Sequence, residues 1–437
     1  MPETSTWIAS QGRPLYGAVH VPGDKSISHR AIMLAALADG VSRIDGFLDS
    51  DDTQATVAIF RQMQVRIATP SATTCIVHGV GLFGLQPPAS CLDCKNAGTA
   101  MRLLAGLLAG QRFHSTLVGD RSLSRRPMRR VTVPLRQLGA QIMTSEDGTA
   151  PLRIVGNRPL VGINYRCDIA SAQVKSAILL AGLFAQGRTC VIEPRPTRDY
   201  TERMLIACGA AVEVSAHHSA VYGRQPLRAI DHHVPGDFSS AAFFIVAASI
   251  IRGSRLTLQS VGLHPRRTGL LEALHRMGAR IDVRNQRPFG GGCVGDIHVH
   301  AARLHGITLP EELVADMIDE LPIFMIAAAA ASGSTHITGA KELRVKETDR
   351  LAAMVTGLRQ LGIAVEERAD GAIIQGGPFG SATVDSAGDH RIAMAFAVAG
   401  QIAQGPVHIR DVANVATSFP GFGAYAVALG CALSDPN

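Results

Sequence analysis

Aromatic residues are scarce in this sequence of 437 residues: they make up 5% of it, and tryptophan occurs once. Proteins that bind nucleic acid commonly combine stacking aromatics with dense runs of lysine and arginine. The densest basic run here, Arg121 to Arg130, has few aromatics near it. The net charge of +6 therefore favours small acidic ligands, and nucleic-acid binding is the less favoured alternative.

Long apolar runs are also missing. The two most apolar stretches, Ala241 to Ile251 and Leu321 to Ala331, are shorter than the ~20 residues that a helix needs to cross a bilayer. Residues 1–10 lack the basic and apolar regions of a secretory signal. We therefore expect a soluble, cytoplasmic protein with no membrane partner.

The eight cysteines are scattered, and Cys91 and Cys94 form a lone CxxC pair. A structural zinc site usually needs a second such pair or nearby histidines, and the sequence supplies neither. Core or surface thiols are the simpler interpretation, so we expect no metal site.

One pattern recurs six times along the chain. Each copy has a polar cluster, a long apolar stretch, a glycine and then a strand-like alternation. The glycines expected to end the apolar helices are Gly40, Gly110, Gly187, Gly253, Gly333 and Gly405. A repeat of this kind indicates one α/β unit used six times.

The chain is too long for one hydrophobic core, which favours two domains. Three repeats would form each domain, with the break near Val234 to Gly236. The first domain is expected to comprise residues 22–234. Residues 1–21 contain a strand-like stretch, Leu15 to Val21, and are expected to join residues 235–437 in the second domain.

The polar clusters that open the apolar stretches contain residues that cap helices well, because their oxygens accept first-turn amides. They lie at residues 23–30, 96–102, 171–176, 236–240, 317–320 and 388–391. A helix N-terminus also attracts anions, and Lys25, Arg30, Arg102 and Arg391 add positive charge within the first turns. Capping explains any one cluster about equally well, but an anion-binding cleft better explains the set.

Residues 343–351 place two cations close together. We expect a helix that starts near Arg344, with a buried stripe formed by Leu351, Met354, Leu358 and Leu361. Lys346 and Arg350 would then share one helix face, with Glu347 beside them. Like charges at this spacing repel by a few tenths of a kcal/mol. A bound anion between them would remove the repulsion.

Six motifs together resemble the 3-phosphoshikimate 1-carboxyvinyltransferases, also called EPSP synthases. They are PGDKSISHR (22–30), NAGTAMR (96–102), SRRPM (124–128), RVKETDR (344–350), GDHRIAMAF (388–396) and ATSFP (416–420). The segments ASAQVKS (170–176) and TRDY (197–200) are similar to the corresponding segments of class II members of this family. The resemblance extends from Pro22 to Pro420.

The resemblance implies an α/β fold: an inverse α/β barrel of two domains, with three βαβαββ repeats each and an active site in the cleft between them. It implies transfer of the carboxyvinyl group of phosphoenolpyruvate to the 5-hydroxyl of shikimate 3-phosphate, with release of phosphate. It also implies that no cofactor is used, that the partners are these two anionic substrates, and that the enzyme is a monomer.

The resemblance assigns site residues by position. The residues expected to bind shikimate 3-phosphate are Lys25, Ser26, Arg30, Ser171, Gln173, Arg198, Asp319 and Lys346, with Thr197 assisting at the phosphate. Those expected to bind phosphoenolpyruvate are Lys25, Gly98, Arg126, Gln173, Arg350 and Arg391. Asp319 would take the hydroxyl proton and Glu347 would protonate the methylene carbon, with Lys25 as a third catalytic residue.

Some of these residues also have structural explanations. Gly98 could provide a turn with positive φ instead of close approach to a ligand. Arg126, beside Arg125, could belong to a solvated basic patch. Asp319 could cap the apolar helix that follows it, although Glu320 could do so alone.

The sequence departs from the family pattern at three positions. Thr417 occupies a position where many relatives have lysine, and Lys175 is a candidate replacement. Leu103 and Ala172 replace a proline and a serine. The sister family, UDP-N-acetylglucosamine 1-carboxyvinyltransferase, is the competing enzyme, but it typically has a cysteine in the loop corresponding to residues 119–127, and this loop has none.

Overall fold

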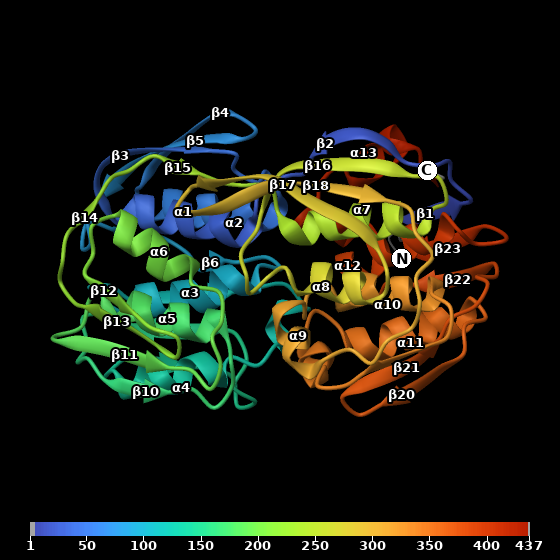
Figure 1. The fold of residues 1–437 in the computed structure, drawn as a ribbon. Coiled ribbons are helices and arrows are strands. Elements are labelled where there is room, and N and C mark those ends of the chain that lie inside the picture. The colour runs from blue at the N-terminus through green and yellow to red at the C-terminus, as the bar shows by residue number, and fades with distance from the viewer. Residues whose placement is uncertain (1–4, 436–437) are drawn as a thin grey trace. The chain divides into compact units, whose positions relative to one another are not determined.

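The computed structural model describes residues 5–435 and divides into two compact units (Figure 1). Unit 1 contains the residues up to 22, residues 235–288 and residues from 293 onward. Unit 2 contains residues 23–234 and 289–292. The chain therefore leaves unit 1 after Pro22 and re-enters it at Pro235.

The described part of unit 2 has three sheets, with strand orders β14-β3-β5-β4 (β15 also pairs with β3), β6-β7-β9-β8 and β10-β11-β13-β12. The helices are α1 (Lys25–Leu37), α2 (Asp51–Gln62), α3 (Gly98–Ala109), α4 (Arg129–Gln137), α5 (Ala172–Gly182) and α6 (Tyr200–Ala207), with a short 3₁₀ helix η1 (Leu123–Arg125). The strands are β3 (Ala38–Asp45), β4 (Arg66–Ser71), β5 (Thr74–Val80), β6 (Leu92–Asp93), β7 (Ser115–Val118), β8 (Gln141–Met143), β9 (Leu152–Val155), β10 (Asn164–Arg166), β11 (Arg188–Ile192), β12 (Val212–Val214), β13 (His218–Tyr222), β14 (Leu227–Arg228) and β15 (His232–His233).

The described part of unit 1 also has three sheets, ordered β17-β18-β16-β2, β19-β21-β20 and β22-β23-β1-β24. Its helices are α7 (Phe238–Ile250), α8 (Gly269–Arg276), α9 (Glu311–Asp316), α10 (Leu321–Ala330), α11 (Arg350–Gln360), α12 (His390–Gly400) and α13 (Phe422–Leu429), with η2 (Lys341–Val345) and η3 (Ala413–Thr417). Its strands are β1 (Thr6–Ser10), β2 (Tyr16–His20), β16 (Arg255–Gly262), β17 (Arg280–Phe289), β18 (Gly292–His300), β19 (Ser334–Ile337), β20 (Val365–Arg368), β21 (Gly371–Gln375), β22 (Ala382–Asp385), β23 (Val407–Arg410) and β24 (Ala432–Ser434).

The apolar stretches form helices that are buried on nearly all sides. Every residue from Phe238 to Ser249 in α7 is buried, as is every residue of α12. In Figure 1 these helices lie inside each unit and the sheets lie on its outside. A helix without a polar face must be enclosed in this way, so α1, α3 and α5 form the centre of unit 2, and α7, α10 and α12 form the centre of unit 1.

Polar side chains fix where four of these helices begin. Asp24, Ser171, Asp237 and Asp389 each accept a hydrogen bond from a first-turn amide of α1, α5, α7 and α12, respectively. Each such cap contributes about 1 kcal/mol. The predicted capping role of these clusters is confirmed at these four helices.

A strand follows each apolar helix, as the sequence predicts: β3, β7, β11, β16, β19 and β23. The strand predicted near residues 15–21 is β2, which pairs in parallel with β16 from Tyr16 opposite Arg255 to His20 opposite Gln259. The segment before unit 2 thereby completes a sheet of unit 1.

The predicted helix ends are wrong at most of the glycines. Gly110 does occupy the C-cap of α3, but α1 ends at Leu37 and Gly40 lies inside β3. The reason is that Ala38 already has the extended backbone of a strand, at φ −78° and ψ 158°. Gly40, at φ +116°, then supplies a conformation that residues with a side chain rarely adopt.

A buried histidine joins the first two helices. The Nδ1 atom of His29 in α1 lies 2.7 Å from Oγ1 of Thr56 in α2. Among the described residues, its Nε2 atom has no hydrogen-bond partner. Burial, together with the charges of Lys25 and Arg30, lowers the pKa of His29 to about 3.

We predict that His29 makes the protein less stable in acid. The unfolded chain takes up a proton near pH 6.5, whereas the folded chain resists it down to about pH 3. As the pH is lowered from 6.5 towards 3, His29 should therefore decrease the free energy of unfolding by about 1.4 kcal/mol per pH unit. Urea titrations from pH 7 to 4 should show a shallower pH dependence for His29→Gln. Equal slopes for the two proteins would contradict the prediction.

Candidate active site

The residues predicted to bind substrate in unit 2 come from the first turns of three buried helices and from two connections. This unit 2 cluster consists of Lys25, Ser26, Arg30, Gly98, Arg126, Ser171, Gln173, Thr197 and Arg198. Ser171 is the N-cap of α5 and accepts from the amide of Val174 at 3.4 Å. The positive ends of α1, α3 and α5 therefore carry the cluster.

Gln173 joins the first turns of α3 and α5. Its Oε1 atom accepts a hydrogen bond from Nη1 of Arg102 at 2.9 Å, and its Nε2 atom donates to Oγ1 of Thr99 at 2.9 Å. Both polar atoms of the Gln173 side-chain amide are thus held by neighbours on α3. Arg102, which the assigned site set does not include, is fixed beside it.

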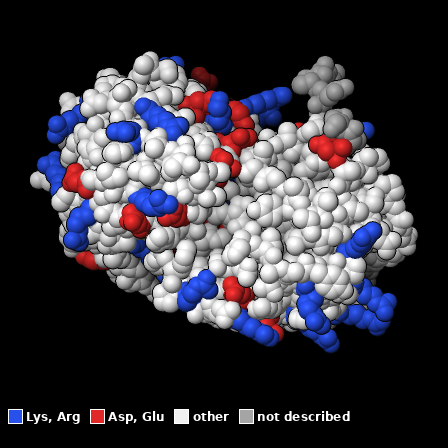
Figure 2. All heavy atoms as spheres, turned by 90° about the horizontal axis from the view of Figure 1, so that it is seen from above, with Lys and Arg blue, Asp and Glu red and all other residues white. Residues whose placement is uncertain are grey.

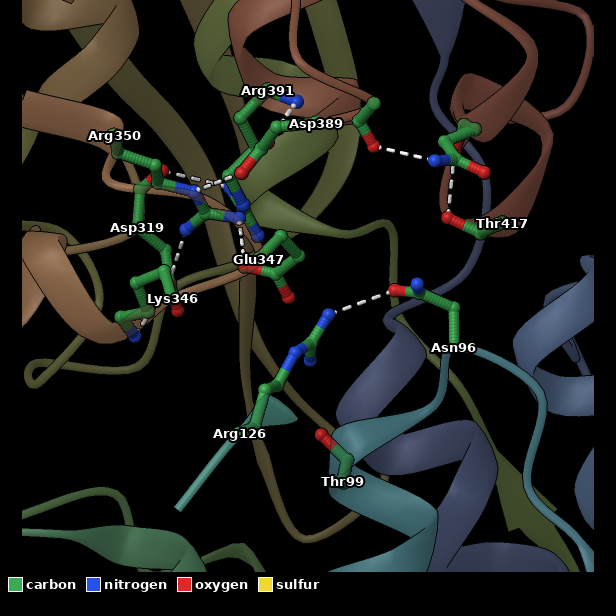
Figure 3. A network of polar contacts seen from close by, with 12 residues as sticks. Asn96, Thr99, Arg126, Asp319, Lys346, Glu347, Arg350, Asp389, Arg391 and Thr417 are labelled. Atoms are coloured by element: carbon green, nitrogen blue, oxygen red, sulfur yellow. Dashed lines mark hydrogen bonds and ion pairs between the residues drawn. The ribbon is translucent and has the colours of Figure 1, made fainter. Parts of the chain in front are cut away.

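Arg126 is buried, so the solvated-patch interpretation is wrong for this residue. Its Nη2 atom donates to Oδ1 of Asn96 at 2.9 Å (Figure 3). Asn96 Nδ2 in turn donates to Asp120 Oδ2 at 2.7 Å. Arg125 beside it is exposed. The turn after η1 therefore directs one arginine inward and leaves its neighbour in solvent.

Gly98 is the first residue of α3, and its backbone is not in the positive-φ region. The turn interpretation is therefore wrong. A β-carbon at this position would lie 2.7 Å from Nη1 of Arg126 and 3.0 Å from Nη1 of Arg102. The missing side chain leaves room for two guanidinium groups to approach the end of the helix.

Arg30 is buried between three helices. Its Nε atom donates to Thr201 Oγ1 at 2.8 Å, and its Nη2 atom donates to Ser176 Oγ at 2.9 Å. Burial and the charge of Arg198 lower the pKa of Arg30 to about 10. The side chain therefore stays charged at neutral pH beside a second cation, an arrangement that favours an anion.

Lys25 is partly exposed at the start of α1. Its Nζ atom lies 2.9 Å from Oδ2 of Asp52, a residue of the first turn of α2. Ser26 contributes its carbonyl oxygen, which accepts from Arg30 Nη1 at 2.9 Å. The sequence did not predict a role for Asp52, because an acidic residue near the start of a helix is common.

In unit 1, one buried arginine organises the second group of predicted residues (Figure 3). Arg350 places Nε 2.7 Å from Asp389 Oδ2, Nη1 3.4 Å from Asp319 Oδ1 and Nη2 2.5 Å from Glu347 Oε2. Burial alone would lower the pKa of Arg350, but the carboxylates of Asp389, Glu347 and Asp319 outweigh it and raise the pKa. We call Asp319, Lys346, Glu347, Arg350 and Arg391 the unit 1 cluster.

The predicted helix over Lys346 is wrong. Residues 341–345 form η2, and α11 begins only at Arg350, because the side chain of Asp349 accepts from the amide of Ala352 and caps α11 there. Lys346 and Glu347 lie in the intervening turn. The buried stripe of α11 and its C-cap is confirmed, since Leu351, Met354, Leu358 and Leu361 are fully buried.

The repulsion expected between Lys346 and Arg350 is relieved by the protein itself. Oδ1 of Asp319 lies 3.1 Å from Lys346 Nζ and 3.4 Å from Arg350 Nη1. Asp319 is therefore the anion between the two cations. Its backbone carbonyl also accepts from Arg391 Nη1 at 2.9 Å.

Two buried carboxylates support the unit 1 cluster and were not assigned from the sequence. Asp389 caps α12 with one oxygen and pairs with Arg350 through the other. Glu320 makes no capping bond to α10, contrary to expectation. Its carboxylate accepts from Ser239 Oγ and lies 3.7 Å from Arg391 Nη1. The sequence signal for both was their place in the polar clusters, where capping was the simpler interpretation.

Lys175 does not replace the lysine that many relatives have near Thr417. Its side chain is buried, and Nζ lies 2.7 Å from Glu193 and 2.9 Å from Glu202. Thr417 is buried as well, and its hydroxyl donates to the carbonyl of Asn414 at 2.7 Å. Asn414 in turn donates to the carbonyl of Gly388 (Figure 3), next to the cap of α12.

Within residues 5–435, no group of three or more His, Cys, Asp or Glu side chains is arranged to hold a metal ion. In the same part of the chain, no helix combines the length and apolarity needed to span a membrane. On the face shown in Figure 2, basic side chains are dispersed and several have acidic neighbours.

Comparison with known proteins gives consistent results across the chain. A family model described as EPSP synthase (3-phosphoshikimate 1-carboxyvinyltransferase) matches residues 9–424. The 3-phosphoshikimate 1-carboxyvinyltransferase of Xanthomonas axonopodis pv. citri (strain 306) is 62% identical over 430 residues, which cover 98% of each chain. The relative of the same name from Xanthomonas campestris pv. campestris (strain B100) is 62% identical over 431 residues, 99% of this chain and 98% of the relative.

Solved structures agree with the fold. An EPSP synthase from Acinetobacter baumannii superposes with a TM-score of 0.89 at 46% identity, covering 99% of this chain and all of the other. The enolpyruvyl transferase NikO from Streptomyces tendae has a TM-score of 0.78 at 18% identity and 99% coverage of both chains. The second similarity supports the fold alone.

Proposed function

The chain belongs to the EPSP synthase family, and from this premise we propose that its two clusters of charged side chains bind the two substrates of that reaction. The enzyme is a 3-phosphoshikimate 1-carboxyvinyltransferase of aromatic amino-acid biosynthesis, acting on shikimate 3-phosphate and phosphoenolpyruvate. Its fold is the α/β fold of enolpyruvyl transferases. The roles of individual residues are our proposals.

Shikimate 3-phosphate is assigned to Lys25, Ser26, Arg30, Ser171, Gln173, Thr197, Arg198, Asp319 and Lys346. The observation that supports its phosphate position is the pair formed by Arg30 and Arg198, two cations close enough for one to lower the pKa of the other. A phosphate between them would neutralise both. Gln173, oriented by Thr99 and Arg102, is available to both substrates.

Phosphoenolpyruvate is assigned to Lys25, Gly98, Arg126, Gln173, Arg350 and Arg391. Arg126 and Arg350 are both buried and held by hydrogen bonds or ion pairs. Fixed guanidinium groups suit carboxylates and phosphates because they can donate two parallel hydrogen bonds. Little reorganisation is then needed when the substrate binds.

Asp319 and Glu347 are the proposed proton-transfer groups, and Lys25 is the third proposed catalytic residue. Asp319 would accept the proton of the 5-hydroxyl while Glu347 protonates the methylene carbon, and elimination of phosphate would reverse both transfers. The observation that carries this proposal is that Arg350 contacts both carboxylates. One cation thus holds both groups in place.

We further propose that the six-fold pattern reflects six βαβαββ repeats, three in each domain, and that both domains contribute to one active site. The support is that cations assigned to the substrates occur in both units, since Lys25, Arg30 and Arg126 belong to unit 2 and Lys346, Arg350 and Arg391 to unit 1. The two substrates together carry two phosphates and two carboxylates. We also propose that the enzyme acts as a monomer in the cytoplasm. Size-exclusion chromatography with light scattering tests the oligomeric state.

We predict that the amide variants Asp319→Asn and Glu347→Gln lower kcat by roughly 10² to 10⁴-fold, the usual contribution of one proton-transfer group. KM should change much less, because no cation is removed. Phosphate release from phosphoenolpyruvate and shikimate 3-phosphate measures both constants. UDP-N-acetylglucosamine and a polynucleotide are tested as rival ligands. Neither should replace shikimate 3-phosphate in supporting phosphate release.

Matched controls for this experiment are Asp282→Asn and Glu366→Gln. Both carboxylates are exposed and belong to strands β17 and β20. These variants should keep kcat within about twofold, as is usual for surface substitutions. Normal turnover in either amide variant of the site would remove that residue from the mechanism.

Glyphosate inhibits members of this family. We predict that Gly98→Ala weakens the binding of glyphosate more than the binding of phosphoenolpyruvate. The new methyl group would displace Arg126, whose Nη1 atom would be only 2.7 Å away. Glyphosate is longer than phosphoenolpyruvate and should tolerate the narrower site less well. The inhibition constant and KM, measured in both forms, provide the comparison.

Gly423→Ala is the control for added helix propensity, because the nearest atom to its β-carbon would be 3.9 Å away. It should change neither constant. Equal fold-changes in KM and the inhibition constant for Gly98→Ala would show that the methyl group does not discriminate between the two ligands.

We predict that the two units draw together when substrate and inhibitor bind. In the proposed shared site, the phosphates and carboxylates of the ligands would bind cations of both units and so bridge them. Small-angle scattering should show a smaller radius of gyration with shikimate 3-phosphate and glyphosate present. An identical profile with both ligands at saturation would argue against closure.

A further inference from the structure

Three charged side chains are buried together behind the unit 2 cluster. Nζ of Lys175 in α5 lies 2.7 Å from Oε2 of Glu193 and 2.9 Å from Oε1 of Glu202, and all three side chains are at most 4% exposed. Burial alone would lower the pKa of Lys175, but Glu202 and Glu193 outweigh it and raise the pKa. The lysine is therefore a buried, charged group at neutral pH.

Stability alone explains this triad poorly. Buried ion pairs lose much of their attraction to the cost of removing charges from water, and well-packed apolar residues often serve as well or better. The triad also contains one more carboxylate than cations. Arg30 offsets that excess, since Glu202 is among the groups that act to raise the pKa of Arg30.

The two oxygens of Glu193 have different partners. Oε2 binds Lys175, while Oε1 accepts a hydrogen bond from Thr197 Oγ1 at 2.5 Å. Glu193 directly follows β11, and residues 194–199 then run without regular structure to the start of α6. The triad therefore ties the middle of this connection to α5.

Glu202 anchors the far side of the same connection. It lies in the first turn of α6, and its Oε1 atom accepts from Lys175 and from Ser219 Oγ of β13 at 2.9 Å. Lys175 thus links α5, which carries Ser171 and Gln173, to both ends of the 194–199 connection. A single buried cation fixes three segments relative to one another.

We propose that Lys175 and Glu193 are positioning residues for the phosphate of shikimate 3-phosphate, with Glu193 holding Thr197 and Arg198 in their binding position. This inference rests on the proposed role of Thr197 and Arg198 at that phosphate. Neither Lys175 nor Glu193 needs to touch the substrate.

The sign of the effect separates positioning from electrostatics. Glu193 and Glu202 are both negative groups near proposed phosphate ligands, so removing either charge should by its field alone tighten phosphate binding. In Glu193→Gln the single amide oxygen can accept from Lys175 or from Thr197 but not from both, so the charge-assisted hydrogen bond of Thr197 is lost and phosphate binding should weaken. A rise in KM for shikimate 3-phosphate in Glu193→Gln therefore cannot come from the charge change.

The experiment compares Glu193→Gln with Glu202→Gln, which each neutralise one buried carboxylate on Lys175. We expect Glu193→Gln to raise KM for shikimate 3-phosphate about tenfold, the effect of one misplaced charge-assisted contact. KM for phosphoenolpyruvate should stay within about twofold. Glu202→Gln should lower Tm comparably while leaving KM for shikimate 3-phosphate unchanged or lower.

Variants of the lysine extend the comparison. Lys175→Met should raise KM for shikimate 3-phosphate as Glu193→Gln does, and Lys175→Arg, which keeps the charge, should restore most of the affinity. Should Glu193→Gln fail to fold, the contrast between Lys175→Met and Lys175→Arg carries the test, because neither substitution changes a proposed substrate ligand.

Arg198→Gln separates failure of this inference from failure of the proposed function. If Arg198→Gln raises KM for shikimate 3-phosphate and Glu193→Gln does not, the positioning role is overturned and the binding assignment stands. If Arg198→Gln has no effect, the assignment of this connection to the phosphate is wrong. A third outcome is that Glu193→Gln and Glu202→Gln both raise KM for shikimate 3-phosphate and KM for phosphoenolpyruvate by the same factor. The triad would then have only a structural role, and the positioning role would be overturned.

Discussion

The buried guanidinium of Arg350 is the interaction on which the unit 1 cluster depends. It contacts three carboxylates from separate parts of the chain. They are those of Asp319, just before α10, Glu347, in the turn before α11, and Asp389, the N-cap of α12. A cation without these partners could not remain buried. Conversely, Asp319, Glu347 and Asp389 would repel one another without it. The geometry of the proposed acid and base is therefore fixed by charge balance more than by helix packing.

Unit 2 meets a related constraint in a different way. Its cluster includes the first turns of α1, α3 and α5, where the unpaired amides already favour negative charge. Arg30 and Arg198 add to this field instead of cancelling it: burial and, after it, the charge of Arg198 lower the pKa of Arg30. Carboxylates such as Glu193 and Glu202 stand behind these cations and bind Lys175.

Apolar helices make both arrangements possible. Because α1, α3, α5, α7, α10 and α12 are enclosed by sheets or other helices, their ends are among the few places where polar groups can lie beside the core. Side chains at these ends are held by caps and ion pairs of fixed geometry. Preorganisation of this kind is what electrostatic catalysis requires.

The sequence by itself determined the family, the α/β fold class, the buried helices and the strand after each of them. These follow from periodicity and from motifs that are local in the chain, such as the stripe from Leu351 to Leu361. Gly98 could be recognised as unusual from the sequence, but only the structure placed Arg102 and Arg126 against it.

Tertiary structure decided which charges pair. The cap at Asp349 keeps Lys346 out of the helix that local spacing predicts, and Asp319, 27 residues away along the chain, then lies between Lys346 and Arg350. Lys175 was available in the sequence as a phosphate ligand, yet Glu193 and Glu202 bind it in the interior. Local pattern cannot reveal such partners, because the energy of an ion pair depends on distance and burial in space and not on separation in sequence.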